Sequence, residues 1–177
     1  DGLRLALVEE GDGDTAIRGF AGVTLAQRDP AASHKLLTQT LGFRLEDSTP
    51  ERKLYRTDQS WLELTTDAGP AGRMGAGTVH HIAWRTPDDN QQAAWLATLD
   101  ALGHHTSPIM DRNYFHSIYF REPGGVLFEI ATDPPGFTVD QPLEELGKKL
   151  VLPAWLEPSR DKIQRFLPKL QLPVTAK

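Results

Sequence analysis

The chain contains no cysteine among its 177 residues. Disulfide bonds, thiolate metal sites and cysteine nucleophiles are therefore excluded from it, and we expect a reducing, cytoplasmic location. No apolar run approaches the roughly 18 residues that a membrane-spanning helix needs, so no membrane partner is expected. The 19 lysine and arginine residues are outnumbered by 24 aspartate and glutamate residues, which gives a net charge of −5. Without a basic stripe, the chain is not expected to bind nucleic acid.

The sequence does contain an internal repeat and enough apolar residues for one core. Hydrophobic residues make up 39% of the chain, and the length suits one domain with a tail. Residues 20–25 (FAGVTL) and 79–84 (VHHIAW) both read as strands. Each is followed by aspartate and then by an alanine- and leucine-rich helix. Both helices are predicted to end before a glycine, Gly42 or Gly103, the residue preferred at that position.

Three strand candidates follow each predicted helix. They are residues 43–48, 53–57 and 61–66 in the first repeat, and residues 105–110, 114–121 and 126–132 in the second. Each repeat therefore predicts a strand–helix–strand–strand–strand (βαβββ) module, and the two modules span residues 18–66 and 78–133. Together they predict an α+β domain over residues 18–133. The buried face of the second helix is predicted to carry Trp95, Leu96, Leu99 and Leu102.

The two ends of the chain have a different character. Residues 1–10 begin with a turn and an alternating strand pattern, so we interpret them as the last strand of a preceding N-terminal domain, joined by a linker at residues 11–17. Residues 134–177 are rich in proline and are predicted to be a C-terminal tail with short helices, one of them near residues 159–167. We expect the tail to pack against the domain or a partner, and the chain to be the C-terminal half of a longer protein.

Two predicted strands each carry one side chain that can bind a metal among apolar neighbours. Strand alternation places His81 on the same face as Ala83. It places Glu129 on the face of its strand opposite to that of Phe128 and Ile130. If the bulky faces pack on the helices, His81 and Glu129 both point to the open side of the sheet. An imidazole and a carboxylate suit iron(II), manganese(II) or zinc(II). The same alternation turns His116 away from Tyr119.

Structural roles compete with these functional ones. A strand histidine such as His80 is more often a hydrogen-bonded structural residue. Glu129 could form an ion pair with Arg112 or Arg121, because a carboxylate buried without a partner is costly. Tyr119 could belong to the core with its hydroxyl group at the rim. The residues by themselves leave these alternatives open.

Longer motifs make the chain resemble a known family. The repeated module is similar to that of the vicinal oxygen chelate superfamily, which includes glyoxalase I, extradiol dioxygenases and bleomycin-resistance proteins. This resemblance implies an open, mostly antiparallel, eight-stranded half-barrel built from paired modules. The segments that resemble the hydroquinone ring-cleaving dioxygenases are residues 77–83, 111–125, 129–137, 146–150 and 152–153. The resemblance covers most of residues 18–160.

The resemblance also implies an activity and a site. The complete protein is expected to be a non-haem iron(II), extradiol-type dioxygenase. It would use O2 to open 1,4-dihydroxylated aromatic rings with or without chlorine. His81 and Glu129 are the implied metal ligands, and His80, Arg112 and Tyr119 are the implied catalytic residues around the bound phenol. The alternatives are a glyoxalase-like metal isomerase or lyase and a non-catalytic, small-molecule-binding module of the resistance type.

The family pattern requires a third metal ligand, a histidine in another module. In this chain Gly22 occupies the position of His81 in the first repeat, and Ala6 occupies the position of Glu129 in the opening strand. Neither residue can bind a metal. We therefore expect the third ligand to come from the N-terminal half of the same protein, and we expect the complete protein to form a homo-oligomer.

Overall fold

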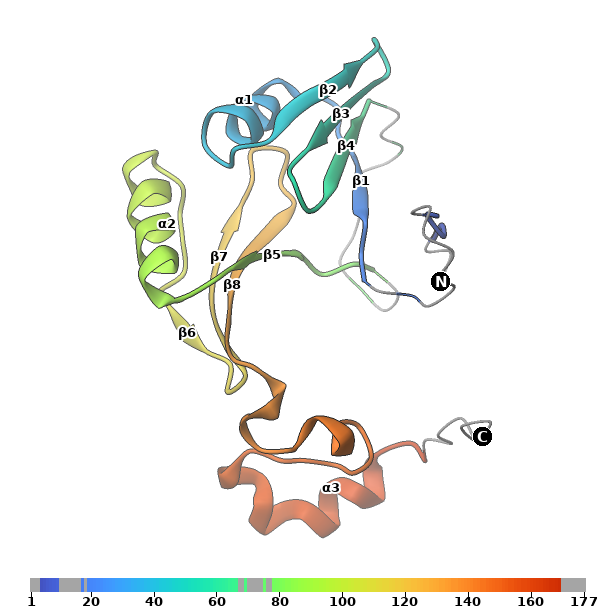
Figure 1. Ribbon diagram of the computed structural model, residues 1–177, viewed down its shortest axis with the longest axis vertical. Coiled ribbons are helices and arrows are strands. Elements are labelled where there is room, and N and C mark those ends of the chain that lie inside the picture. Colours follow the sequence, from blue (N-terminus) through green and yellow to red (C-terminus); the bar gives the residue numbers. More distant parts are fainter. Residues whose placement is uncertain are drawn as a thin grey trace.

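The computed structural model describes residues 4–9, 17, 19–66, 69, 75 and 78–169. The first module consists of β1 (Gly22–Ala26), α1 (Ala31–Gln39), β2 (Arg44–Ser48), β3 (Arg52–Arg56) and β4 (Trp61–Thr65). The second consists of β5 (Ile82–Thr86), α2 (Asp89–Ala101), β6 (Met110–Asp111), β7 (Phe115–Arg121) and β8 (Leu127–Pro135). Figure 1 shows α1 and α2 on the same side of the sheets, and we call the face turned away from these helices the open face.

The two modules have the same topology. The strand orders are β1-β4-β3-β2 and β5-β8-β7-β6, and each module forms its own four-stranded sheet. In each sheet the first and last strands of the module pair in parallel, and the other pairs are antiparallel. The predicted α+β fold with two βαβββ modules is therefore confirmed. The described strands form two separate sheets rather than a closed barrel.

Some predicted strand boundaries are wrong. Instead of a strand over residues 105–110, only Met110–Asp111 is a strand. The preceding segment contacts β7 irregularly, because the Ser107 hydroxyl accepts a hydrogen bond from the Tyr119 N–H (3.0 Å) in place of a backbone carbonyl. Pro108, which follows, has no N–H to donate. The described residues 4–9 do not form a strand, and no described strand pairs with them.

The helix ends follow the sequence prediction closely. The Asp88 side chain caps α2 by accepting a hydrogen bond from the Gln91 N–H at 2.8 Å. Gly42 and Gly103 follow the helices with left-handed φ angles of 74° and 80°, which glycine adopts without steric cost. Leu102, predicted to lie on the buried face of α2, is exposed because the helix ends at Ala101.

One apolar core connects the two modules. Its fully buried members are Leu62, Leu64, Tyr55, Leu99, Ile118, Phe120 and Phe128, and it also includes buried residues of α1. Trp84 packs edge-on against Phe43 of the first module, with 5.3 Å between ring centroids. It packs in the same way against Phe128 of its own module, at 5.6 Å. The modules therefore share one hydrophobic interior.

A buried carboxylate reinforces this connection. Glu122, just after β7, is almost fully buried. It accepts hydrogen bonds from Gln27 Nε2 (2.9 Å) and Ser33 Oγ (2.5 Å), both in the first module. A third hydrogen bond comes from the Val126 N–H at 2.9 Å. The second module thus carries a buried anion whose side-chain donors belong to the first.

The C-terminal extension lies beyond the end of β8, below the sheets in Figure 1. It contains the short helices η1 (Phe137–Val139), η2 (Leu143–Glu145), η3 (Ala154–Ser159) and α3 (Arg160–Phe166). The short helix predicted near residues 159–167 is therefore present. Several large apolar side chains of the extension are exposed, including Trp155 and Phe166. Within the described residues, none of the helices has the length and apolar character that crossing a membrane requires.

Candidate metal centre

His81 and Glu129 meet on the open face of the second sheet. His81 directly precedes β5, and Glu129 lies on β8, the parallel neighbour of β5. The register pairs Ala83 with Glu129, so the carboxylate comes beside the histidine ring. His81 Nε2 and Glu129 Oε2 are 2.7 Å apart. The two residues that the sequence predicts as metal ligands are therefore brought into direct contact.

The surroundings of Glu129 exclude the arginine pairing that the sequence left open. The Glu129 side chain is only 3% exposed, and the His81 side chain is 35% exposed. The second carboxylate oxygen, Oε1, accepts a hydrogen bond from Ser117 Oγ. Arg121 donates instead to the Gly125 carbonyl at 2.8 Å, and the Arg112 guanidinium lies over the Tyr119 ring. A histidine and a hydroxyl group thus satisfy this buried carboxylate.

His80 lies beside His81 rather than on the opposite face. The two Nδ1 atoms are 2.8 Å apart and share a hydrogen bond, and the rings are nearly perpendicular at 89°. Strand alternation would separate the two side chains. Because both residues precede Ile82, the first residue of β5, that alternation does not apply to them. His80 is exposed. It contacts Nδ1 of His81, whereas Glu129 contacts the other ring nitrogen, Nε2.

Tyr119 borders the pair on the neighbouring strand. It lies directly across from Glu129 in the pairing of β7 with β8, so both side chains occupy the same face. Its ring is 5.9 Å from the His81 ring, in an edge-on arrangement at 85°. The Arg112 guanidinium lies 5.4 Å from the centroid of the Tyr119 ring, in the range of a cation–π contact. The structure therefore gathers all five predicted site residues in one region.

A tight turn presents Arg112 beside the site. Asn113 has a left-handed φ of 68°, a conformation that asparagine tolerates better than most residues. Its N–H donates to the Asp111 side chain at 2.7 Å, and the Arg112 N–H donates to the Phe115 carbonyl at 2.9 Å. These bonds fix the backbone of Arg112 while its side chain stays exposed.

His116 faces the other side of β7, as its alternation with Tyr119 predicts. Its Nδ1 lies 2.6 Å from Asp89 Oδ1, in the first turn of α2. The hydrogen bond to Asp89 raises the pKa of His116 above its usual value. His116 is therefore part of a surface ion pair rather than part of the metal centre.

Sequence reasoning missed Ser117. This residue is fully buried, and its hydroxyl group contacts Glu129. A serine inside a strand carries no chemical signature of its own. The face on which it lies could have been predicted, because Ser117 comes two residues before Tyr119 and therefore shares its face of β7.

Sequence reasoning also missed Glu63, the first-module equivalent of Glu129. The pairing of β1 with β4 places it where the pairing of β5 with β8 places Glu129. Glu63 forms an ion pair with Arg52 Nη1 at 2.9 Å. The position equivalent to His81 is Gly22, where a Cβ atom would lie 2.1 Å from the Trp61 ring. An arginine and a tryptophan therefore occupy the space that a metal centre would need in the first module.

The second module offers the nitrogen and oxygen donors of a divalent-metal centre, but only two of them. His81 Nε2 and Glu129 Oε2 face each other, and both atom types suit first-row divalent cations. Within the part of the chain that the structure describes, no group of three or more histidine, aspartate or glutamate side chains could hold a metal ion. Among the described residues, His81 and Glu129 therefore offer two donors of the kind that a divalent metal prefers.

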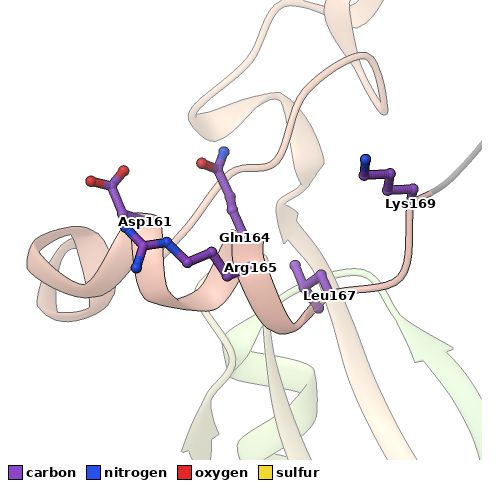
Figure 2. Close-up of a pocket in the computed structure, with 5 residues that line it drawn as sticks. All are labelled: Asp161, Gln164, Arg165, Leu167 and Lys169. Atoms are coloured by element: carbon purple, nitrogen blue, oxygen red, sulfur yellow. The ribbon is translucent and has the colours of Figure 1, made fainter.

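Two surface hollows lie away from these residues. Figure 2 shows the larger one beside α3, lined by Asp161, Gln164, Arg165, Leu167 and Lys169. The polar ends of these side chains do not converge on one point (Figure 2). A second hollow, also on the C-terminal extension, includes Lys149, Glu157 and Arg160. Neither hollow contains a residue of the candidate metal centre.

Comparisons with known proteins identify the family of the chain. The sequence pattern of the Glyoxalase/Bleomycin resistance protein/Dioxygenase superfamily matches residues 19–130. The chain is 41% identical over 181 residues to "Putative ring-cleaving dioxygenase MhqO" of Bacillus subtilis (strain 168), covering 94% of this chain and 58% of that protein. It is 42% identical over 95 residues to "Chlorohydroquinone/hydroquinone 1,2-dioxygenase" of Sphingobium indicum, covering 53% of this chain and 29% of that protein.

A solved structure supports the fold. The crystal structure of a "putative dioxygenase" from Bacillus subtilis superposes with a TM-score of 0.81 at 43% sequence identity. The superposition covers 88% of this chain and 51% of the other. The chain therefore spans about half the length of the relatives that it matches over most of its own length.

Proposed function

Because the chain belongs to the Glyoxalase/Bleomycin resistance protein/Dioxygenase superfamily, we propose that it is the C-terminal half of a non-haem iron(II), extradiol-type ring-cleaving dioxygenase. The proposed substrates are hydroquinone-type rings, with or without chlorine, which the complete enzyme opens with O2. The observation that carries the proposal is the contact of 2.7 Å between His81 Nε2 and Glu129 Oε2 on an open sheet face. The name of the Sphingobium relative supports the substrate class.

In this proposal, His81 Nε2 and Glu129 Oε2 are the two ligands from this chain. A histidine of the N-terminal half is the third ligand, since Gly22 and Ala6 cannot bind a metal. Manganese(II) and zinc(II) accept the same donors and are the alternatives to iron(II). Bound iron(II) would supply open coordination positions at which a phenolate and O2 react. The N-terminal half is thus the partner that completes the centre.

Arg112 and Tyr119 are the proposed substrate-orienting residues. The Tyr119 ring lies edge-on to the His81 ring, and the Arg112 guanidinium lies over the Tyr119 ring. A guanidinium and a phenolic hydroxyl group are donors that can stabilise the oxyanion of a bound phenol. Preorganised donors of this kind typically contribute about 3 kcal/mol each, or roughly 10²–10³ in rate.

His80 is the proposed proton-transfer residue. Its Nδ1 shares a hydrogen bond with Nδ1 of His81, and this bond fixes the ring at the edge of the site. A ring nitrogen in that place can accept the proton that a substrate hydroxyl group loses on binding, and can return it later in the reaction. Its exposure allows exchange of that proton with solvent.

The test is oxygen consumption by the full-length protein that contains this chain. The protein is loaded with iron(II) under anaerobic conditions and is then given hydroquinone in an oxygen-electrode cell. We expect one O2 to be consumed for each ring opened, because both oxygen atoms enter the product. An isomerase or a binding module would consume none. Iron-loaded protein that consumes no O2 with hydroquinone or chlorohydroquinone would overturn the proposal.

A further inference from the structure

Ser117 fixes the orientation of the Glu129 carboxylate. Ser117 is fully buried on β7, and its Oγ donates a hydrogen bond to Glu129 Oε1. The other carboxylate oxygen, Oε2, contacts His81 Nε2 on the open side. One oxygen is therefore held toward the sheet, and the other is directed at the place where a metal would bind.

The backbone around Ser117 is itself fixed from two sides. The register of β7 against β8 shifts just before Ser117. At this irregularity Gln92 of α2 donates to the carbonyl groups of His116 and Ile130, both at 2.8 Å. The His116 N–H donates to Thr132 Oγ1 at 2.9 Å. A fully buried side chain from the helix thus bridges both strands next to Ser117.

The first module shows what a different residue does at this position. Arg52 pairs with Thr65 on β4 as Ser117 pairs with Ala131 on β8, so the two positions are equivalent. Arg52 donates to Glu63 and brings a positive charge against that carboxylate, a charge that it shares with Asp47. A serine hydroxyl group also donates a hydrogen bond but carries no charge. It therefore leaves the negative charge of Glu129 available for a cation.

We propose that Ser117 is a positioning residue for the metal centre. It orients Glu129 so that Oε2 alone faces the open side, and it does so without neutralising the carboxylate. This inference rests on the proposed function, because it assigns Ser117 to the same centre. The competing explanation is that the hydroxyl group only satisfies a buried carboxylate, as Ser33 does for Glu122.

The test compares three variants of the full-length protein: S117A, S117T and S33A. S33A is a matched control, because it removes a buried serine–glutamate hydrogen bond outside the centre. Affinity for iron(II), and for manganese(II) as an oxygen-stable probe, is measured by titration, and the unfolding of the metal-free proteins is measured with urea. We expect S117A to bind both metals about 10–100-fold more weakly than wild type, as is typical when a residue that orients a ligand is lost.

We expect S33A to unfold at lower urea concentration while its metal affinity stays at the wild-type value. S117T, which keeps the hydroxyl group, should regain most of the affinity. Wild-type affinity in S117A would overturn the inference. Equal affinity losses in S117A and S33A, or in S117A and folded S117T, would overturn it too. If the wild-type protein consumes O2 with hydroquinone while S117A binds metal normally, only this inference fails. If the wild-type protein binds neither metal, the proposed function fails with it.

Discussion

At the scale of single residues, the negative charge of one carboxylate decides whether the candidate centre can hold a cation. Replacing Glu129 by glutamine keeps the size of the side chain and removes its charge. In the full-length protein we expect the E129Q variant to lose its iron while keeping its fold, because a neutral amide is a poor ligand for a divalent cation. Elemental analysis gives the iron content, and circular dichroism reports the fold.

The chain offers a matched control for this change. Glu63 occupies the equivalent strand position in the first module, where Arg52 pairs with it. We expect the E63Q variant to keep the full iron content. An E129Q protein that retains the wild-type amount of iron would show that Glu129 is not a ligand.

A second residue-scale prediction concerns the pH dependence of stability. The hydrogen bond to Asp89 raises the pKa of His116, so the folded state binds the histidine proton more tightly than the unfolded state does. The stabilisation is therefore complete below the unfolded pKa of about 6.5 and is lost as the pH rises through the higher folded pKa. In the D89N variant we expect a lower pKa for His116, measured by NMR titration.

The stability difference between wild type and D89N should shrink as the pH rises through the folded pKa of His116. Urea unfolding at a series of pH values measures this difference. The H116Q variant serves as the control, because the D89N change should then have no pH-dependent effect in that range. An unchanged His116 pKa in D89N would contradict the pairing seen in the structure.

Single residues differed in how far the sequence predicted them. Glu129 faces the side that strand alternation and its apolar neighbours predict, and His81 lies beside it although it precedes β5. The position of His80 could not be predicted in this way, since it precedes the strand and follows no alternation. Ser117 was missed because a hydroxyl group becomes informative only when its partner is known.

At the scale of secondary-structure elements, α2 holds β7 and β8 in register through Gln92. This side chain is fully buried and donates to one carbonyl group on each strand, at 2.8 Å. In the Q92A variant both carbonyl groups lose this donor. We expect a loss of about 1–3 kcal/mol in the free energy of unfolding, the range for leaving a buried polar group unsatisfied. Urea denaturation measures this loss.

Gln91 provides the control for that measurement. It lies next to Gln92 in the sequence but is exposed on the surface of α2. The Q91A variant should change the free energy of unfolding by no more than about 0.5 kcal/mol. If Q92A is as stable as Q91A, Gln92 does not hold the two strands.

Elements with strong local signals were predicted well from the sequence. The aspartate before α2 and the glycine residues after both helices act locally, so their effect can be read without knowing the fold. The segment over residues 105–110 was predicted as a strand and is mostly irregular. There the Ser107 hydroxyl group replaces a backbone carbonyl, and a contact of this kind depends on a distant strand.

At the scale of the whole molecule, the proposed centre takes two protein ligands from this chain and one from the N-terminal half. We expect the 177-residue chain by itself to bind iron(II) at least about tenfold more weakly than the full-length protein, because one protein ligand is absent. Dialysis of both proteins against a graded series of chelator concentrations, followed by iron analysis, measures the difference. Equal retention by the two proteins would mean that the third ligand is not in the N-terminal half.

The sequence predicted that the molecule contains two repeated modules, but not how their strands are divided between sheets. Two modules of like topology followed from the repeated order of strand and helix signals, which does not depend on distant contacts. The separation into two sheets did not follow, because it is determined by which strands find hydrogen-bonded neighbours. Residues 11–16 of the predicted linker lie outside the described residues, and the preceding N-terminal domain stays a prediction.

The buried Glu122 has a consequence for how this protein can vary. Its side-chain donors, Gln27 and Ser33, belong to one repeat, and the carboxylate belongs to the other. A change at Gln27 or Ser33 in the first repeat therefore leaves a buried carboxylate of the second repeat without one of its donors. These positions are coupled across the two repeats, and a substitution at one of them is tolerated only with a compensating change at the other.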